Sequence, residues 1–211
     1  MDHDTIAAMF TAPDGAFRFA RWRRPLAPVV FGVDEATLAA FHGAFRALCT
    51  LAGRDMAETD PELGSNVMVF CCRDWAELDA VPDLDRLVGT PELGARLEAA
   101  GADRFRAFRF EADGAIRACF VFLRIDEAAG MEAATLALGE TAQIMLAFAE
   151  GAFAGASPLA LLPDGRAVLR PEIGALIAAA YDPVLPDASE ATETALRLAA
   201  RIAAGPGGAG G

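Results

Sequence analysis

Residues 105–125 read FRAFRFEADGAIRACFVFLRI, and this stretch does most to decide the fold class. Aromatic and β-branched residues are frequent in both halves, which favours extended strands. Between the halves lies Glu111-Ala112-Asp113-Gly114, a turn sequence with glycine where a positive φ is wanted. The stretch therefore predicts a β-hairpin. Arg104, Arg106 and Arg109 on its first strand indicate that this strand is partly exposed.

Two further strands and a helix are expected upstream of the hairpin. Residues 26–33 centre on Val29-Val30-Phe31, and residues 66–72 form a continuous apolar run that predicts a buried central strand. Within residues 34–53, apolar side chains recur every three or four positions, which predicts an amphipathic helix. Residues 75–100 are interrupted by prolines and glycine, which predicts an insertion of short helices packed on one side of the sheet.

Helices dominate the rest of the chain. A long helix is expected from Met131 to about Ala149, and a second helix from Pro171 to Ala180, with proline well placed in its first turn. Residues 151–170, between them, are interpreted as a loop. A third helix is expected over residues 189–203. The glycine-rich residues 205–211 are typical of a flexible tail.

The pattern as a whole predicts an α+β protein with one mixed β-sheet, a long helix beneath it, a helical insertion and C-terminal helices. A chain of 211 residues is long enough for one such domain with a full core. We expect residues 1–20 to be an N-terminal lead-in and residues 21–186 to form the domain. Residues 187–204 are expected to form a C-terminal helix.

The charge of the chain argues against two classes of partner. The 18 basic residues are all arginine and stand against 30 acidic residues, for a formal net charge of −12. Nucleic acids and anionic lipid surfaces attract basic proteins, so neither is an expected partner. No apolar stretch approaches the roughly 20 residues that span a bilayer. The N-terminus shows no signal peptide, and we therefore expect a cytoplasmic protein.

Three groups of residues could bind a metal or an anion, and each also has a structural interpretation. The cysteines at positions 49, 71, 72 and 119 make no Cys-x-x-Cys pair and have apolar neighbours, which indicates buried reduced thiols. Cys71 and Cys72 would face opposite sides of a strand and would not readily bind one metal. His42 has no partner histidine nearby and is expected to be structural. Residues 21–24 fit either an anion patch or a strand edge whose arginines reach into solvent.

The expected order of elements is similar to that of the zincin metalloproteases, in which the helix after the edge strand carries His-Glu-x-x-His. There the two histidines hold zinc and the glutamate is the general base. The matching place in this chain reads Gly139-Glu140-Thr141-Ala142-Gln143, which keeps the glutamate and lacks both histidines. No histidine follows His42 either. We therefore expect no catalytic zinc site and no cofactor.

Three stretches also resemble an uncharacterised proteobacterial family, the domain of unknown function numbered twenty-nine twenty-seven. They are the strand Cys119–Ile125, Glu140-Thr141-Ala142-Gln143 and Tyr181-Asp182-Pro183. The resemblance extends over residues 22–186 and implies the same zincin-like fold, without an established activity. It adds Tyr181 and Asp182 to Glu140 and Gln143 as candidate binding residues. Many members resemble exported or lipid-anchored proteins.

Glu140 and Gln143 allow three interpretations: a solvated helix face, the lining of a ligand pocket, or part of a metal-assisted site. Our leading hypothesis is a non-catalytic zincin-like protein that binds a peptide, protein or small ligand in the cleft beside the Glu140 helix. One alternative is a hydrolase with Glu140 as general base and metal-binding carboxylates such as Glu132 or Asp182. The other is an assembly protein that associates through its alanine-rich C-terminal helices, for example as a homo-oligomer.

Overall fold

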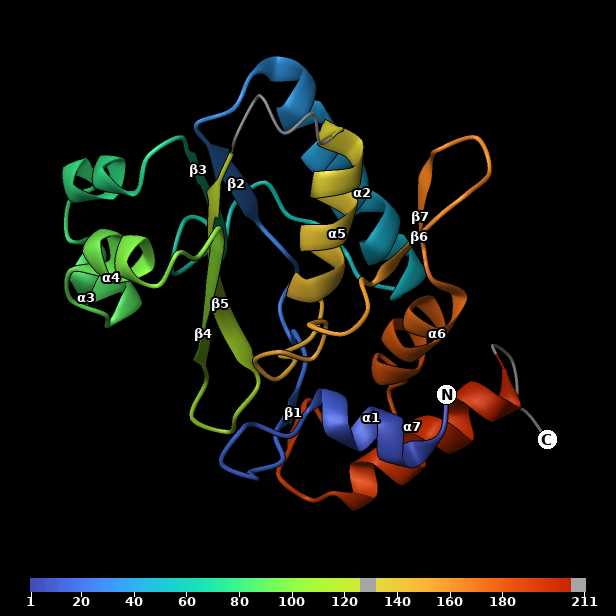
Figure 1. Ribbon diagram of the computed structural model, residues 1–211. Coiled ribbons are helices and arrows are strands. Elements are labelled where there is room, and N and C mark those ends of the chain that lie inside the picture. The colour runs from blue at the N-terminus through green and yellow to red at the C-terminus, as the bar shows by residue number, and fades with distance from the viewer. Residues whose placement is uncertain (126–131, 206–211) are drawn as a thin grey trace.

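The computed structural model of the protein describes residues 1–125 and 132–205. Its centre is an open, mixed sheet of four strands in the order β2-β3-β5-β4 (Figure 1). The strands are β2 (Pro28–Phe31), β3 (Val67–Cys72), β4 (Arg104–Phe110) and β5 (Ile116–Arg124). β2, β3 and β5 run parallel, and β4 is antiparallel to β5. The predicted α+β class, the central strand and the hairpin are thereby confirmed.

Helices cover both faces of the sheet. On one face lie α2 (Glu35–Leu51), α5 (Ala133–Ile144) and α6 (Pro171–Ala180), which enclose the larger hydrophobic core. The other face is covered by η1 (Trp75–Ala80), α3 (Leu84–Val88) and α4 (Leu93–Ala99). In Figure 1 α3 and α4 stand on the opposite side of the strands from α2 and α5. The helical insertion predicted for residues 75–100 is therefore confirmed.

A row of phenylalanine rings crosses all four strands of the sheet. The register pairs Phe31 with Phe70, Phe70 with Phe122, and Phe122 with Phe105. Adjacent ring centroids lie 5.1, 5.0 and 6.2 Å apart, within the range in which aromatic pairs attract each other. Phe70, Phe122 and Phe105 belong to the core that α3 and α4 cover, so they fix these strands against one another beneath the helices, whereas Phe31 at the end of the row is exposed.

The helix predicted to reach about Ala149 is shorter in the structure. Residue 131 lies outside the described residues, and α5 ends at Ile144. Beyond this point the backbone turns toward the N-terminal segment, where the Ala147 N–H donates a hydrogen bond to the Ala20 carbonyl at 3.0 Å. The predicted extension is wrong because this long-range bond replaces a helical one.

The two ends of the chain pack together at one end of the molecule (Figure 1). There α1 (His3–Met9) lies against α7 (Glu193–Ala204), and β1 (Phe19–Ala20) pairs with β8 (Ala188–Ser189). Aromatic and aliphatic side chains of the first 20 residues are buried in the same core as α2 and α5: Ile6, Phe10, Phe17 and Phe19. The last helix begins four residues later than predicted because β8 pairs with β1.

Three other segments complete the comparison with the sequence. The interpretation of residues 151–170 as a loop misses a short hairpin, β6 (Leu159–Leu161) and β7 (Ala167–Leu169). The helix predicted for residues 171–180 is confirmed as α6. The predicted tail falls outside the described residues from position 206 onward. Among the described helices, none has both the length and the apolar character needed to cross a membrane.

Candidate functional site

Glu140 is the buried centre of the candidate site. It lies on α5 with 2% of its surface exposed, and each carboxylate oxygen accepts a hydrogen bond from a different arginine of β4. Arg104 Nη1 lies 3.0 Å from Oε1, and Arg106 Nη2 lies 2.9 Å from Oε2. A carboxylate buried this deeply is tolerated because the two guanidinium groups compensate its charge.

Gln143 lies one turn further along α5 and completes the cluster. Its Oε1 accepts a hydrogen bond from Arg106 Nη1 at 3.4 Å, and its Nε2 donates to the Gly139 carbonyl at 3.1 Å. Both Glu140 and Gln143 are buried. The interpretation of this pair as a solvated helix face is therefore wrong, because the arginines of β4 cover this side of α5.

Simple periodicities bring these four side chains together. Arg104 and Arg106 are two residues apart on β4, so they project from the same face of the sheet. Glu140 and Gln143 are three residues apart and share one side of α5. Sequence reasoning missed the two arginines as site residues. The alternation of Arg104 and Arg106 on one face of a strand was the available signal. The sequence around them does not show which helix packs against that face.

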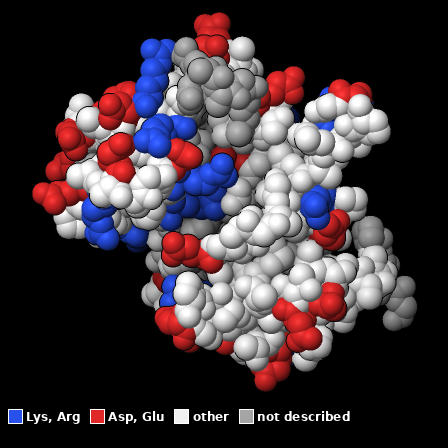
Figure 2. All heavy atoms as spheres, in the orientation of Figure 1, with Lys and Arg blue, Asp and Glu red and all other residues white. Residues whose placement is uncertain are grey.

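A hollow of about 680 Å³ opens beside this cluster. Its walls are β4, α5 and the segment 148–159, which combine aromatic rings with the charged groups. The lining includes Phe108, Phe148, Phe153, Leu159, Gly139, Glu140 and Gln143. In Figure 2 basic side chains gather near the middle of the face, between the positions of β4 and α5 in Figure 1. A largely apolar recess with a few convergent polar groups is the usual form of a ligand site.

Tyr181 and Asp182 do not line this hollow. The Tyr181 hydroxyl donates to the Met145 carbonyl at 2.6 Å, and burial raises the pKa of Tyr181 well above its ordinary value. Asp182 accepts a hydrogen bond from the Val184 N–H at 2.9 Å and forms an ion pair with Arg201 at 3.0 Å. These contacts hold the end of α6 in place, so the structure separates this pair from the α5 cluster.

The carboxylates considered for a metal-dependent hydrolase do not come together. Glu140 is engaged by the two arginines of β4, Asp182 is paired with Arg201, and Glu132 is exposed before α5. In residues 1–125 and 132–205, no three side chains of histidine, cysteine, aspartate or glutamate are grouped so as to hold a metal ion. Within these described residues the hydrolase alternative therefore has no set of metal ligands.

The arginines at positions 21–24 are paired within the chain. Arg21 is buried and donates hydrogen bonds to four acceptors: the carbonyls of Ala180, Asp182 and Leu185 and the carboxylate of Asp187. Arg23 and Arg24 form ion pairs with acidic residues: Asp113, Asp187, Glu62 and Glu111. The anion-patch interpretation is therefore wrong. Arg21 also does not reach into solvent, because the carbonyls at the end of α6 surround it.

All four cysteines are buried free thiols, as predicted. Cys71 and Cys72 belong to the different hydrophobic cores on the two faces of the sheet. Burial raises the pKa of Cys71 to about 12 and that of Cys49 to about 11, so these thiols stay protonated at neutral pH. His42 lies exposed on α2 and lines neither this hollow nor the second one described below.

A second hollow, of about 760 Å³, lies at the carboxyl ends of the parallel strands. The two carboxylates in its lining are engaged within the chain. Asp34 caps α2 by accepting from the Thr37 N–H at 2.7 Å, and Glu77 Oε1 accepts from the Arg73 and Asp74 N–H groups. We therefore place the candidate site in the first hollow, where polar side chains from a strand and a helix converge.

No family model, curated protein or solved structure matches the chain. The geometry and chemistry of the first hollow are therefore the observations that bear on function.

Proposed function

We propose that the protein is a non-catalytic binding protein of zincin-like architecture, which holds a peptide, protein or small ligand in the hollow beside Glu140. One observation carries this proposal. Gly139, Glu140 and Gln143, the three positions that match His-Glu-x-x-His, all line the hollow. At the positions of the two zinc-binding histidines of the motif this chain has Gly139 and Gln143, neither of which is a usual zinc ligand.

Glu140 is poorly placed to act as a general base. A general base must reach the proton that it removes, whereas both oxygens of this carboxylate already accept hydrogen bonds from guanidinium groups. Freeing the carboxylate would leave buried charges unpaired, which is unfavourable. The contacts of Glu140 therefore support binding rather than hydrolysis.

The arrangement of the elements supports the zincin-like part of the proposal. An antiparallel strand, β4, lies at the edge of an otherwise parallel sheet, and the helix with the degenerate motif meets it through side-chain contacts. The third wall of the hollow, segment 148–159, comes from the chain that follows this helix. A ligand between these walls would contact the edge strand on one side and α5 beneath it.

The proposal is tested by filling the hollow. A Cβ atom at Gly139 would meet only the flexible side chain of Leu159, at 3.4 Å, so we expect Gly139→Phe to fold and to occupy the recess. Wild type and variant would be screened by NMR against small fragments and short peptides. We expect compounds that shift the amide resonances of β4 and α5 in the wild type and lose this effect in Gly139→Phe.

Gly43→Phe is the matched control, because an added Cβ at Gly43 on α2 has nothing within 4 Å. This variant should respond to every compound that the wild type binds. The hollow is not a binding site if no compound shifts those resonances, or if the shifts persist in Gly139→Phe.

A further inference from the structure

The outer edge of β4 presents backbone groups that the sheet does not use. The Arg124 N–H donates to the Asp103 carbonyl at 2.9 Å, while the Cys119 N–H donates to Asn66 on the other side of β5. Even-numbered residues of β5 therefore face β4, and in an antiparallel ladder bonded pairs recur at every second residue. By this alternation the N–H and C=O groups of Arg104 and Arg106 point away from the sheet.

This edge is also the wall of the hollow that carries the arginines. β4 is the terminal strand of the four-stranded sheet, and the side chains of Arg104 and Arg106 line the hollow. A strand added to β4 would form hydrogen-bonded pairs with these same two residues. Side chains directly opposite each other lie on the same face of a sheet. The residues of an added strand that pair with the arginines would therefore point into the hollow.

Arg104 keeps hydrogen-bond donors available for a ligand. Its Nη1 is held by Glu140, and its side chain is 55% exposed. Within the described part of the chain its Nε and Nη2 make no hydrogen bond or ion pair. A guanidinium group has five N–H donors in a fixed fork that matches a carboxylate. Glu140 thus orients the guanidinium group of Arg104, and the Nε and Nη2 donors of this group remain available to a ligand.

The charges at the β4 wall of the hollow favour an anionic side chain beside Arg104. Arg104 and Arg106 share one buried counter-charge, that of Glu140, so one positive charge remains at the β4 wall. Among the residues that the structure describes, Glu150 is the one other charged residue in the lining, and it is exposed. An acidic residue opposite Arg104 would form a charge-assisted hydrogen bond, which is stronger than a bond between neutral groups.

We infer that the hollow binds an extended acidic peptide, which pairs with β4 as a fifth strand and places a carboxylate on Arg104. This inference rests on the proposed function, because it names the class of ligand for the same site. The peptide backbone would supply affinity through the exposed groups of β4, and Arg104 would supply the preference for aspartate or glutamate.

The first test is a library of random heptapeptides displayed on phage and selected on the full chain. We expect enrichment of an acidic residue at one fixed position among strand-forming neighbours. The best peptide would then be synthesised and its dissociation constant measured by calorimetry. Changing its acidic residue to the matching amide, or Arg104→Gln in the protein, should weaken binding about tenfold or more, because either removes the charge-assisted bond.

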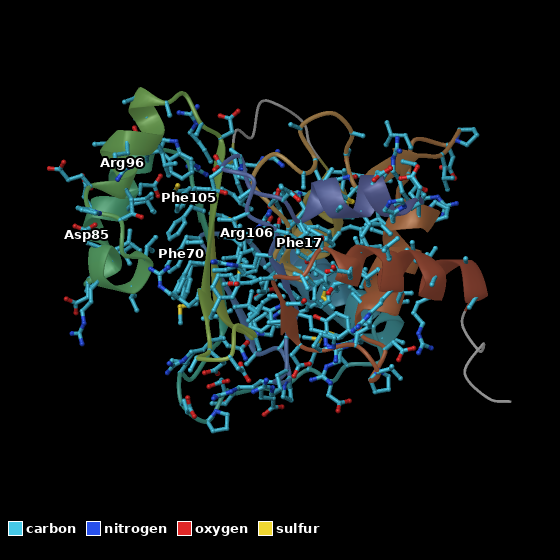
Figure 3. The ribbon with its side chains drawn as sticks, turned by 90° about the horizontal axis from the view of Figure 1, so that it is seen from below. Phe17, Phe70, Asp85, Arg96, Phe105 and Arg106 are labelled. Carbon is cyan, nitrogen blue, oxygen red and sulfur yellow. The ribbon has the colours of Figure 1, made fainter. Side chains whose placement is uncertain are left out.

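Arg96→Gln is the control variant, because Arg96 is exposed on α4, on the other side of the sheet from Arg106 (Figure 3). It should leave the dissociation constant unchanged. The change of the peptide's acidic residue to the amide still tests the preference for a carboxylate if Arg104→Gln does not fold. An amide peptide that binds as tightly as the acidic one would overturn the preference for a carboxylate.

Hydrogen exchange tests the added strand separately. On peptide binding, the amides of Arg104 and Arg106 should exchange more slowly, whereas those of Phe105 and Ala107 already face β5. Every second amide of the bound peptide would donate to β4. N-methylation of that alternating set of amides should abolish binding, whereas N-methylation of the other set should not. If a peptide binds the hollow without protecting these two amides, the added strand is wrong and the proposed function stands. If no compound binds the hollow at all, both fail.

Discussion

At the scale of single residues, Glu140 is a buried carboxylate whose negative charge is balanced by ion pairs with Arg104 and Arg106. Glutamine at this position would keep the shape but remove the counter-charge from Arg106, whose side chain is only 18% exposed. We expect Glu140→Gln to lower the free energy of unfolding by about 3 kcal/mol, as for other broken buried pairs. Urea denaturation measures the change. Glu150→Gln, at the exposed rim, should change it by less than about 0.5 kcal/mol, and equal midpoints for the two variants would contradict the prediction.

A second residue-scale effect concerns Asp60 and pH. Burial alone would raise the pKa of Asp60, but hydrogen bonds from the Leu63 and Glu62 N–H groups and from Asn66, with the charge of Arg24, outweigh it and lower the pKa. Such a carboxyl stabilises the fold above its unfolded-state pKa of about 3.9 and loses this effect as pH falls through the lower folded-state pKa. The protein should therefore lose stability as the pH drops below about 4.

The measurement is the urea midpoint as a function of pH between neutral and about pH 3, the range in which carboxyl groups titrate. Asp60→Asn should be less stable at neutral pH, and its midpoint should fall less steeply in acid. Asp85→Asn, at an exposed position on α3, provides the reference slope. Parallel curves for Asp60→Asn and the wild type would show that Asp60 does not carry the effect.

At the scale of elements, the end of β2 depends on one close approach between strands. Gly32 follows β2 with φ +78, and a Cβ atom there would lie 1.9 Å from the carbonyl oxygen of Cys71 on β3. We expect Gly32→Ala to cost about 3 kcal/mol or more, because the clash adds to the strain of a left-handed residue. Gly15→Ala is the matched control: Gly15 has φ +86 and open space around it, so it should cost only about 1–2 kcal/mol. Thermal unfolding should rank the two variants in this order, and the reverse ranking would refute the argument.

The elements also show which parts of the structure the sequence could predict. The hairpin around Gly114 and the helix after Asp34 rest on local patterns, namely turn residues, a cap and apolar periodicity, and both are confirmed. The end of α5 does not rest on such a pattern. Residues 145–149 suit a helix, and their hydrogen bonds to the N-terminal segment redirect them. The β6–β7 hairpin was equally hidden, because its strands have three residues each.

The candidate site, too, could be predicted from local sequence patterns only in part. Glu140 and Gln143 could be identified from the spacing of a degenerate motif on a helix. Their arginine partners could not, because they lie 34 to 37 positions away and sheet order alone brings them near. The separation of Tyr181 from the hollow likewise depends on the packing of α6, which no local pattern contains.

At the scale of the whole molecule, the first 20 residues belong to the main core rather than to its margin. Ile6 on α1 is fully buried, and α1 packs on α7. We expect Ile6→Ala to lower the free energy of unfolding by about 2–4 kcal/mol, because it leaves a cavity in that core. The fluorescence of Trp22 and Trp75, both buried, should report one shared transition at the lower stability. Leu196→Ala, at a position on α7 that is half exposed, is the control and should have a small effect. An unchanged midpoint for Ile6→Ala would mean that α1 is only loosely attached.

The buried guanidinium of Arg21 has a consequence for how the chain is made. Its acceptors at Ala180, Asp182, Leu185 and Asp187 follow it by 159 to 166 positions. During translation the arginine leaves the ribosome long before any of them exists, so the N-terminal segment cannot reach its final place until most of the chain has been synthesised. A nascent chain that stops before residue 180 would lack all four partners. The N-terminal segment can therefore complete its packing only after residue 187 has been synthesised.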